Sequence, residues 1–215
     1  MADKAALPLF PLSVVLLPGM SLPLHIFEER YKLMIGECVE HESEFGVVLS
    51  DGERVESVGC TAAVRRVLRR YPDGRMDILT VGMKRFRILE ARGGKPYLEA
   101  LVEPLEDSGE SGEEPSADLV AQGTALLVQL AGMLGKPADL AGLQRLSPEQ
   151  MSFRIAAAEG FSPRERQQAL ETTSTRERLE RSIETLERIL QKVRRTIEAR
   201  RLTGGNGHLK EAFPR

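Results

Sequence analysis

The feature that most constrains this sequence is an apolar stretch from Leu7 to Tyr31 that prolines interrupt repeatedly, at Pro8, Pro11, Pro18 and Pro23. A membrane-spanning helix needs about 20 consecutive apolar residues, and each proline removes a backbone donor and breaks such a helix. A secretion signal needs a basic start, an unbroken apolar run and a small-residue cleavage site. The prolines interrupt the run and no such site follows it. The stretch therefore predicts neither a membrane helix nor a secretion signal.

The same stretch predicts two short strands joined by a turn. Leu9–Leu17 supplies the first strand, and Pro18-Gly19 is a turn dipeptide. Met20–Ile26 supplies the second strand, in which Pro23 favours a position at a sheet edge or a bulge. We expect these two strands to pair as a hairpin.

A helix and further short strands are expected before residue 106. The helix runs from Glu28 to about Glu42, because its apolar residues recur at helical spacing, namely Tyr31, Met34, Ile35 and Cys38. Five short strands, each flanked by turn residues, are predicted over 45–49, 58–68, 76–81, 85–90 and 97–102. The turn at Tyr71–Gly74 predicts a hairpin. Short, closely spaced strands with one early helix predict a small barrel-like sheet over residues 1–106.

The pattern becomes helical after an acidic linker at 107–116, which consists of Asp, Glu, Ser, Gly and Pro and is expected to be solvated. Helix N-caps are expected at Ser116, Ser147 and Ser162, and Pro follows the last two as the first helical residue. Residues 117–203 therefore predict a helical bundle, and 204–215 a tail. Together the two parts predict an α+β fold.

A long last helix is predicted from Thr175 to Arg201 by a coiled-coil-like apolar seam. The spacings alternate between four and three along Leu179, Ile183, Leu186, Leu190, Val193 and Ile197. Such a helix would be roughly 40 Å long. Two arrangements remain open for the seam: burial within the bundle, or pairing with a second copy as a homodimer.

Composition and charge narrow the function classes. A net charge of −2 implies no strong attraction to nucleic acid or to a membrane surface. Cys38 and Cys60 are the only cysteines, too few for a disulfide framework, and with no targeting segment they predict a cytoplasmic protein. The chain has no Trp and only 5% aromatic residues, so a base-stacking platform would have few rings.

Two further candidate sites have little support. Cys38 and His41 stand three residues apart on the expected helix, but structural zinc usually needs four ligands. A buried cysteine and a surface histidine are favoured, and we expect no metal or other cofactor. A basic set around the predicted barrel would suit RNA, but the near-zero net charge favours solvated strand faces. This set comprises Arg65, Arg66, Arg69, Arg70, Lys84, Arg85 and Arg87.

The order and spacing of these segments resemble the N-terminal, substrate-binding domain of the Lon protease family. The resemblance covers nearly all of the chain and implies a PUA-like β-barrel followed by a helical bundle. The matching segments are LPLFPL at 7–12, LPG at 17–19, LPLHIFEERY at 22–31, VGCTAAV at 58–64, PDGRMDILTVGMKRFRI at 72–88, PYLEALVEPL at 96–105 and FSPRERQQALETTSTRERLE at 161–180.

The motifs of that family's ATPase and peptidase are not found. A Walker loop, GxxxxGK[ST], cradles phosphates with backbone amides and a lysine, but Pro137 follows Gly135-Lys136 and Leu130 replaces the first glycine. The Ser–Lys peptidases of the family carry a glycine-flanked Pro-Ser-Ala, whereas the Pro-Ser-Ala at 115–117 stands between acidic residues. We therefore expect a stand-alone, non-enzymatic member of the family.

The leading hypothesis is a non-catalytic module that binds unfolded or exposed polypeptide segments, as an adaptor to a proteolytic or chaperone system. The alternative is an RNA- or nucleotide-binding PUA-like protein. Met20, His25, Phe27 and Tyr31 are the candidate polypeptide contacts, because methionine and aromatic side chains adapt to varied partners. Plain core packing is the competing interpretation, and it is favoured for Phe27 and Tyr31.

Overall fold

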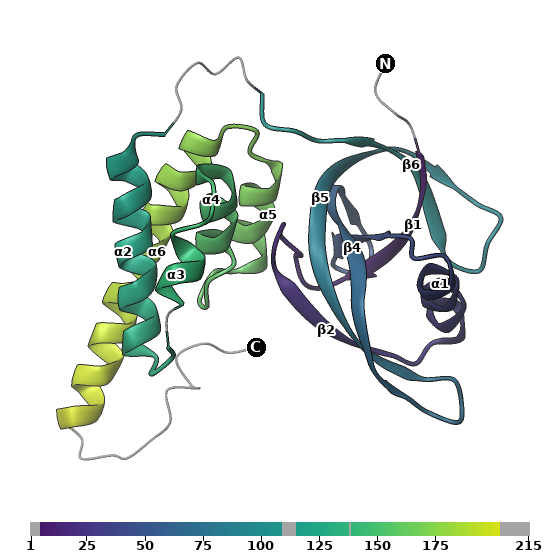
Figure 1. The fold of residues 1–215 in the computed structure, drawn as a ribbon, viewed down its shortest axis with the longest axis horizontal. Helices are drawn as coiled ribbons and strands as arrows, with labels where there is room; N and C mark the ends of the chain where they lie inside the picture. The colour runs from purple at the N-terminus through teal and green to yellow at the C-terminus, as the bar shows by residue number, and fades with distance from the viewer. Residues whose placement is uncertain (1–4, 109–114, 138, 203–215) are drawn as a thin grey trace. The chain divides into compact units, whose positions relative to one another are not determined.

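The computed structural model describes residues 5–108, 115–137 and 139–202. The chain forms two compact units (Figure 1): Met1–Asp107 with Pro163–Thr173, and Ser108–Ser162 with Ser174–Arg215. Most of the predicted acidic linker and all of the predicted tail at 204–215 lie outside the described residues. No helix in the described ranges is long and apolar enough to cross a membrane.

The first unit is built on one six-stranded sheet. Its strands are β1 (Ala5–Leu12), β2 (Ser21–Ile26), β3 (Phe45–Ser50), β4 (Val55–Arg70), β5 (Met76–Arg92) and β6 (Leu98–Pro104). The order is β2-β5-β4-β3-β1-β6, and β6 also pairs with β5, which closes five of the strands into a barrel. Strand β2 stands outside this ring and, in the described part of the chain, pairs only with the first half of β5. The predicted combination of a barrel-like sheet and a later helical region is confirmed.

The predicted hairpin between the first two strands is wrong. Strand β1 pairs with β3 and β6, whereas β2 pairs with β5. The Pro18-Gly19 turn docks on Gly82 of β5 instead: Gly19 N–H donates to the Gly82 carbonyl, and Gly82 N–H donates to the Met20 carbonyl, each at 2.9 Å. A Cβ atom on Gly82 would lie 2.2 Å from the Leu17 carbonyl oxygen, so only glycine permits this approach.

Strand β5 is one continuous strand, although the sequence predicts a break at Gly82. The glycine accommodates the Leu17 backbone and does not end the strand, which continues past it with bulges in its pairing with β4. The predicted hairpin between β4 and β5 is confirmed. Its turn is closed by Tyr71 N–H donating to the Arg75 carbonyl at 2.9 Å, with Gly74 at φ 85°.

Phe86 fills the part of the barrel next to two glycines, Gly46 of β3 and Gly59 of β4. Cβ atoms built on Gly46 and Gly59 would lie 2.6 and 2.5 Å from the Phe86 ring. Around it pack apolar side chains of β1, β3 and β6, namely Leu7, Leu9, Val48, Ala100 and Val102. The glycines thus make room for the largest side chain of this cluster.

Two helices belong to the first unit. Helix α1 (Glu29–Glu40) buries Tyr31, Met34, Ile35 and Cys38, as its periodicity predicts. Helix α5 (Pro163–Glu171) was expected in the helical bundle but groups with the barrel. Gln167 of α5 donates to the Val58 carbonyl of β4 at 3.1 Å.

The second unit contains α2 (Ala117–Met133), α3 (Leu140–Leu143), α4 (Pro148–Ala156) and α6 (Thr175–Leu202). Two of the three predicted caps form here: Ser116 Oγ accepts from Leu119 N–H, and Ser147 with Gln150 makes a reciprocal capping box, while the cap at Ser162 stays a prediction. The first five seam residues of α6 are buried within the chain, where α6 packs on α2 and α4. Burial in the bundle therefore accounts for most of the seam, and dimerisation through α6 stays a prediction.

Candidate functional site

The four residues that the sequence singles out lie in different environments. Tyr31 is buried, and its ring packs on Phe10 with centroids 4.1 Å apart. Met20 is half-buried just before β2. His25 and Phe27 lie together at the end of β2, with their rings stacked and their centroids 6.0 Å apart. Core packing therefore accounts for Tyr31, whereas Phe27 is 59% exposed and is not a core residue.

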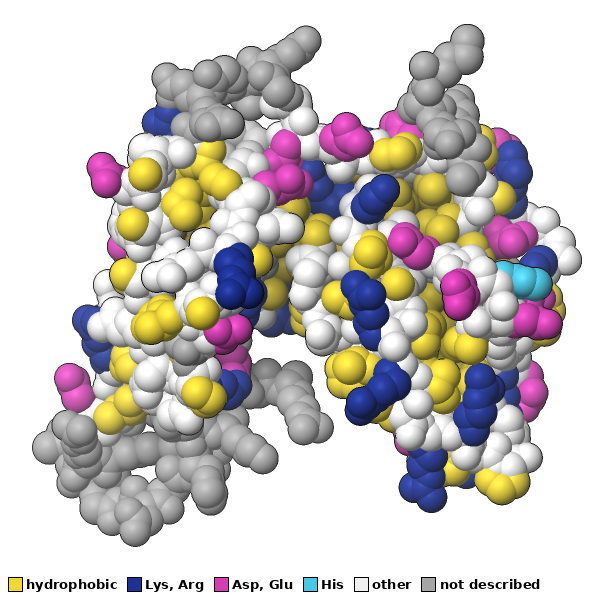
Figure 2. Space-filling view, viewed as in Figure 1, with side chains coloured by type: hydrophobic (Ala, Val, Ile, Leu, Met, Phe, Trp, Pro, Cys, Tyr) yellow, Lys and Arg dark blue, Asp and Glu magenta, His cyan; other side chains and the backbone are white. Residues whose placement is uncertain are grey.

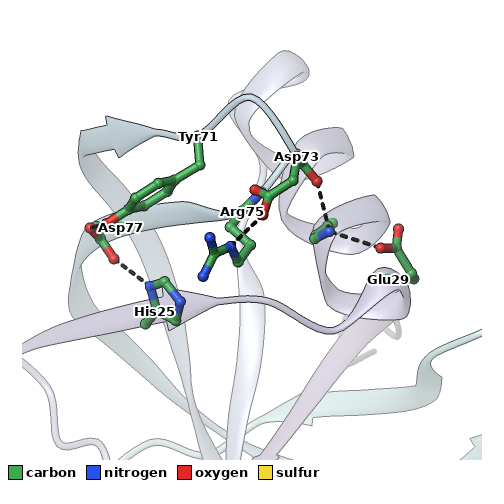
Figure 3. Close-up of polar contacts among 7 residues, drawn as sticks. His25, Glu29, Tyr71, Asp73, Arg75 and Asp77 are labelled. Atoms are coloured by element: carbon green, nitrogen blue, oxygen red, sulfur yellow. Dashed lines mark hydrogen bonds and ion pairs between the residues drawn. The ribbon is translucent and has the colours of Figure 1, made fainter.

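His25 is held in place by the β4–β5 hairpin (Figure 3). Its Nδ1 donates to Asp77 Oδ1 at 2.6 Å, because an ionised carboxylate only accepts. Tyr71 Oη donates to the other carboxylate oxygen of Asp77 at 2.8 Å. The His25 and Tyr71 rings also meet edge to face, with centroids 5.9 Å apart. One carboxylate thus fixes two aromatic side chains, one from β2 and one from the turn between β4 and β5.

Sheet register explains this convergence. His25 of β2 is paired with Asp77 of β5, and Asp77 with Arg69 of β4, so the three side chains form one row across the sheet. Sequence reasoning missed Asp77 and Tyr71, which it treated only as strand and turn residues. To find them, one would need to know that β2 pairs with β5. The spacing of residues within a single segment does not reveal a pairing between strands that are far apart in the sequence.

The turn beside this row is anchored to α1 (Figure 3). Lys32 Nζ donates to the Asp73 carbonyl at 2.9 Å and to Glu29 Oε1 at 2.8 Å. Arg75 Nε donates to Asp73 Oδ2 at 2.7 Å. These bonds fix the hairpin end that presents Tyr71.

The surface around Tyr71 combines rings with positive charge. The Arg69 and Arg75 guanidinium groups lie 4.5 and 5.0 Å from the centre of the Tyr71 ring, within cation–π range. The hydrogen bond from His25, and after it the weaker effect of the bond from Tyr71, hold the pKa of Asp77 below its usual value, so this carboxylate stays ionised. Figure 2 shows apolar and Lys or Arg side chains side by side on the face of the first unit turned to the viewer.

The outer edge of β2 has no strand partner among the described residues. The carbonyls of Met20 and Leu22 accept bonds from Gly82 N–H and Thr80 Oγ1 of β5, so these residues turn their backbone toward β5. Backbone direction alternates along a strand in such a ladder. The backbone N–H and carbonyl groups of Ser21 and His25, and the carbonyl of Pro23, therefore point to the outer edge. Pro23, which has no N–H, occupies a position where no ladder bond to β5 is lost.

The other candidate sites gain no support. Arg85, from the basic set proposed for RNA, is buried and forms an ion pair with Asp107. Cys38 and Cys60 are buried, and burial raises the pKa of both thiols, that of Cys60 to about 12. Within the described ranges no three His, Cys, Asp or Glu residues gather as metal ligands would.

Comparison with known proteins points to one family. The family described as the ATP-dependent protease La (LON) substrate-binding domain matches residues 6–188. The Lon protease of Anaeromyxobacter dehalogenans is 28% identical over 196 residues, which are 86% of this chain and 23% of that protein. Lon protease 2 of Herpetosiphon aurantiacus is 28% identical over 84% of this chain and 23% of its own length. The chain thus spans less than a third of these relatives.

Solved structures agree with this match. The Lon N-terminal domain protein from Xanthomonas campestris has 26% sequence identity and a TM-score of 0.64, over 82% of this chain and 95% of that one. The N-terminal domain of the Mycobacterium avium complex Lon protease has 21% identity and a TM-score of 0.62, over 85% of this chain and 98% of that one, and shows the shared fold.

Proposed function

Because this chain belongs to the family of Lon substrate-binding domains, we propose that it is a non-catalytic module that binds unfolded or exposed polypeptide segments. It would act as an adaptor, presenting such segments to a proteolytic or chaperone partner. The observation that carries this proposal is the exposed Phe27 ring stacked on His25 at the end of β2.

The environment of Phe27 suits a contact residue. Exposing a large aromatic side chain to water is unfavourable, and binding an apolar segment would bury it and lower the free energy. Its neighbour His25 is oriented by Asp77, and Tyr71 is fixed by the same carboxylate. A surface whose side chains are already ordered loses less conformational entropy on binding.

The test is binding of a permanently unfolded protein, reduced and carboxymethylated α-lactalbumin, measured by fluorescence anisotropy with the label on the ligand. The wild-type chain should bind it and should not bind folded, disulfide-intact α-lactalbumin. Phe27→Ala should weaken binding by about 10- to 150-fold, since a buried aromatic contact contributes about 1.5–3 kcal/mol.

The matched control is Leu89→Ala, which removes an exposed apolar side chain that lies on β5, in the same unit as Phe27. It should leave the affinity unchanged. Absence of any binding by the wild-type chain, or equal losses in both variants, would count against the proposal. Binding of a single-stranded RNA at low salt that falls steeply as salt rises would favour the RNA-binding alternative instead.

A further inference from the structure

We infer that the outer edge of β2 binds its ligand as an added β-strand, so that an extended polypeptide segment pairs with the backbone of Ser21, Pro23 and His25. This inference rests on the proposed polypeptide-binding function and specifies its geometry. The occupant is an extended segment with alternating apolar side chains and no excess of basic residues.

Unpaired backbone groups are the first reason. The outer edge offers the N–H groups of Ser21 and His25 and the carbonyls of Ser21, Pro23 and His25, and no backbone bond to these groups is found among the described residues. Exposed strand edges of this kind are templates for pairing with another chain. An added strand satisfies them with main-chain bonds, which are independent of the ligand's sequence.

The second reason is that β2 lacks most of the features that block pairing. Edge strands are commonly protected by lysines, by inward-pointing charges or by bulges. The sequence of β2, SLPLHI, contains no Lys, Arg, Asp or Glu, and its pairing with β5 is regular from Ser21 to Ile26. Pro23 removes one donor from the edge but leaves the flanking N–H groups of Ser21 and His25 available.

The side chains next to this edge determine which side chains and which charge the bound segment should have. Pro23, His25 and Phe27 are exposed along β2 and just beyond it, which favours apolar side chains in the ligand. Arg66 and Arg69 of β4 lie in the same side-chain rows as Pro23 and His25, through Leu79 and Asp77 of β5. The two guanidinium groups outnumber the ionised carboxylate of Asp77 in these rows, and the net positive charge disfavours a basic segment and suits a neutral or acidic one.

Amide hydrogen exchange tests the inference without any mutation. The probe is a ten-residue peptide that alternates Val with Thr and carries one Asp at its end. In the free chain the amides of Ser21 and His25 should exchange quickly, while those of Leu22 and Leu24, bonded to β5, exchange slowly. A saturating amount of peptide should slow exchange at Ser21 and His25 by at least tenfold.

Two variant pairs separate backbone pairing from side-chain contact. Ser21→Pro removes an outer N–H and Ser21→Ala keeps it, as do His25→Pro and His25→Ala. Each proline variant should bind the peptide about fivefold more weakly than its alanine control, the loss expected for one hydrogen bond. Circular dichroism checks that all four fold. The same peptide N-methylated at every residue should lose binding at least tenfold.

The outcomes are distinguishable. If the peptide binds but Ser21 and His25 gain no protection and the proline variants bind like their alanine controls, strand addition is wrong and polypeptide binding stands. If neither the peptide nor unfolded α-lactalbumin binds, the proposed function fails and this inference with it. If both amides are already protected in the free full chain, the edge is covered by the chain itself and the inference is overturned.

Discussion

Arg85 of β5 donates a hydrogen bond from Nη1 to the carbonyl oxygen of Leu170 at 3.0 Å, across 85 residues of sequence. The same nitrogen donates to the Thr172 carbonyl at 2.8 Å, and Nη2 donates to Asp107. The guanidinium therefore binds the end of α5 to the barrel. It also explains why this helix groups with the sheet and not with the other helices.

Replacing this guanidinium should destabilise the first unit. Arg85 is 4% exposed, and Arg85→Met removes the donor that the Leu170 and Thr172 carbonyls and the Asp107 carboxylate share. Breaking a buried ion pair by removing one partner costs about 3–5 kcal/mol. Urea unfolding followed by circular dichroism measures the change. The control Arg87→Met, at an exposed position of the same strand, should change the free energy of unfolding by less than about 0.5 kcal/mol.

Alanine substitution at two glycines of the first unit should change stability in opposite directions, because Gly59 packs on Phe86 whereas Gly36 has open space around it. Gly59→Ala places a Cβ 2.5 Å from the Phe86 ring and 2.6 Å from the Val47 carbonyl, and should cost about 1–3 kcal/mol. Gly36→Ala lies in α1 with no atom within 4 Å, and should add about 0.5–1 kcal/mol through helix propensity. Thermal unfolding of the two variants should shift the midpoint in opposite directions.

The Asp77 carboxylate predicts a pH dependence of stability. The hydrogen bonds from His25 and Tyr71 lower its pKa in the folded chain below the usual 3.8. Because the pKa of Asp77 is lower in the folded chain than in the unfolded chain, its ionised carboxylate stabilises the fold at pH values above the unfolded pKa. This contribution disappears as the pH falls below about 4. Asp77→Asn should therefore be less stable than wild type at pH 6, and the gap should narrow between pH 4 and pH 2.5. A constant gap over that range would contradict this account of Asp77.

The two thiols should be unreactive in the folded chain. Cys38 and Cys60 are buried, and burial raises the pKa of Cys60 to about 12, so almost no thiolate forms at pH 8. Iodoacetamide at pH 8 should label neither cysteine in native buffer and both in 6 M guanidinium chloride. Rapid native labelling at Cys60 would show that the barrel opens far more readily than its packing implies.

Local pattern is sufficient to predict much of the fold. The apolar stripe of α1, the cap at Ser116 and the capping box at Ser147 depend on residues within one or two turns, and all three form as the sequence predicts. The Tyr71–Gly74 turn is equally local. Such features succeed because the side chains that determine them are neighbours along the chain.

Long-range pairing is where sequence reasoning fails. Strand β2 pairs with β5, more than 50 residues later, because Gly82 admits the Leu17 backbone. No spacing within 7–31 reveals that partner. The candidate site follows the same rule: the sequence singles out His25 and Phe27, but the pairing of β2 with the β4–β5 hairpin is what brings Asp77 and Tyr71 to His25.

The central claim, that an unfolded polypeptide contacts the end of β2, is tested most directly by photocrosslinking. A photoreactive p-benzoylphenylalanine replaces Phe27 in one variant and Leu89 in another, each exposed on the first unit. After irradiation with reduced, carboxymethylated α-lactalbumin, Phe27→p-benzoylphenylalanine should give a covalent adduct that unlabelled ligand competes away, and the Leu89 variant should give none. Equal adducts from both positions, or none from either, would contradict the claim.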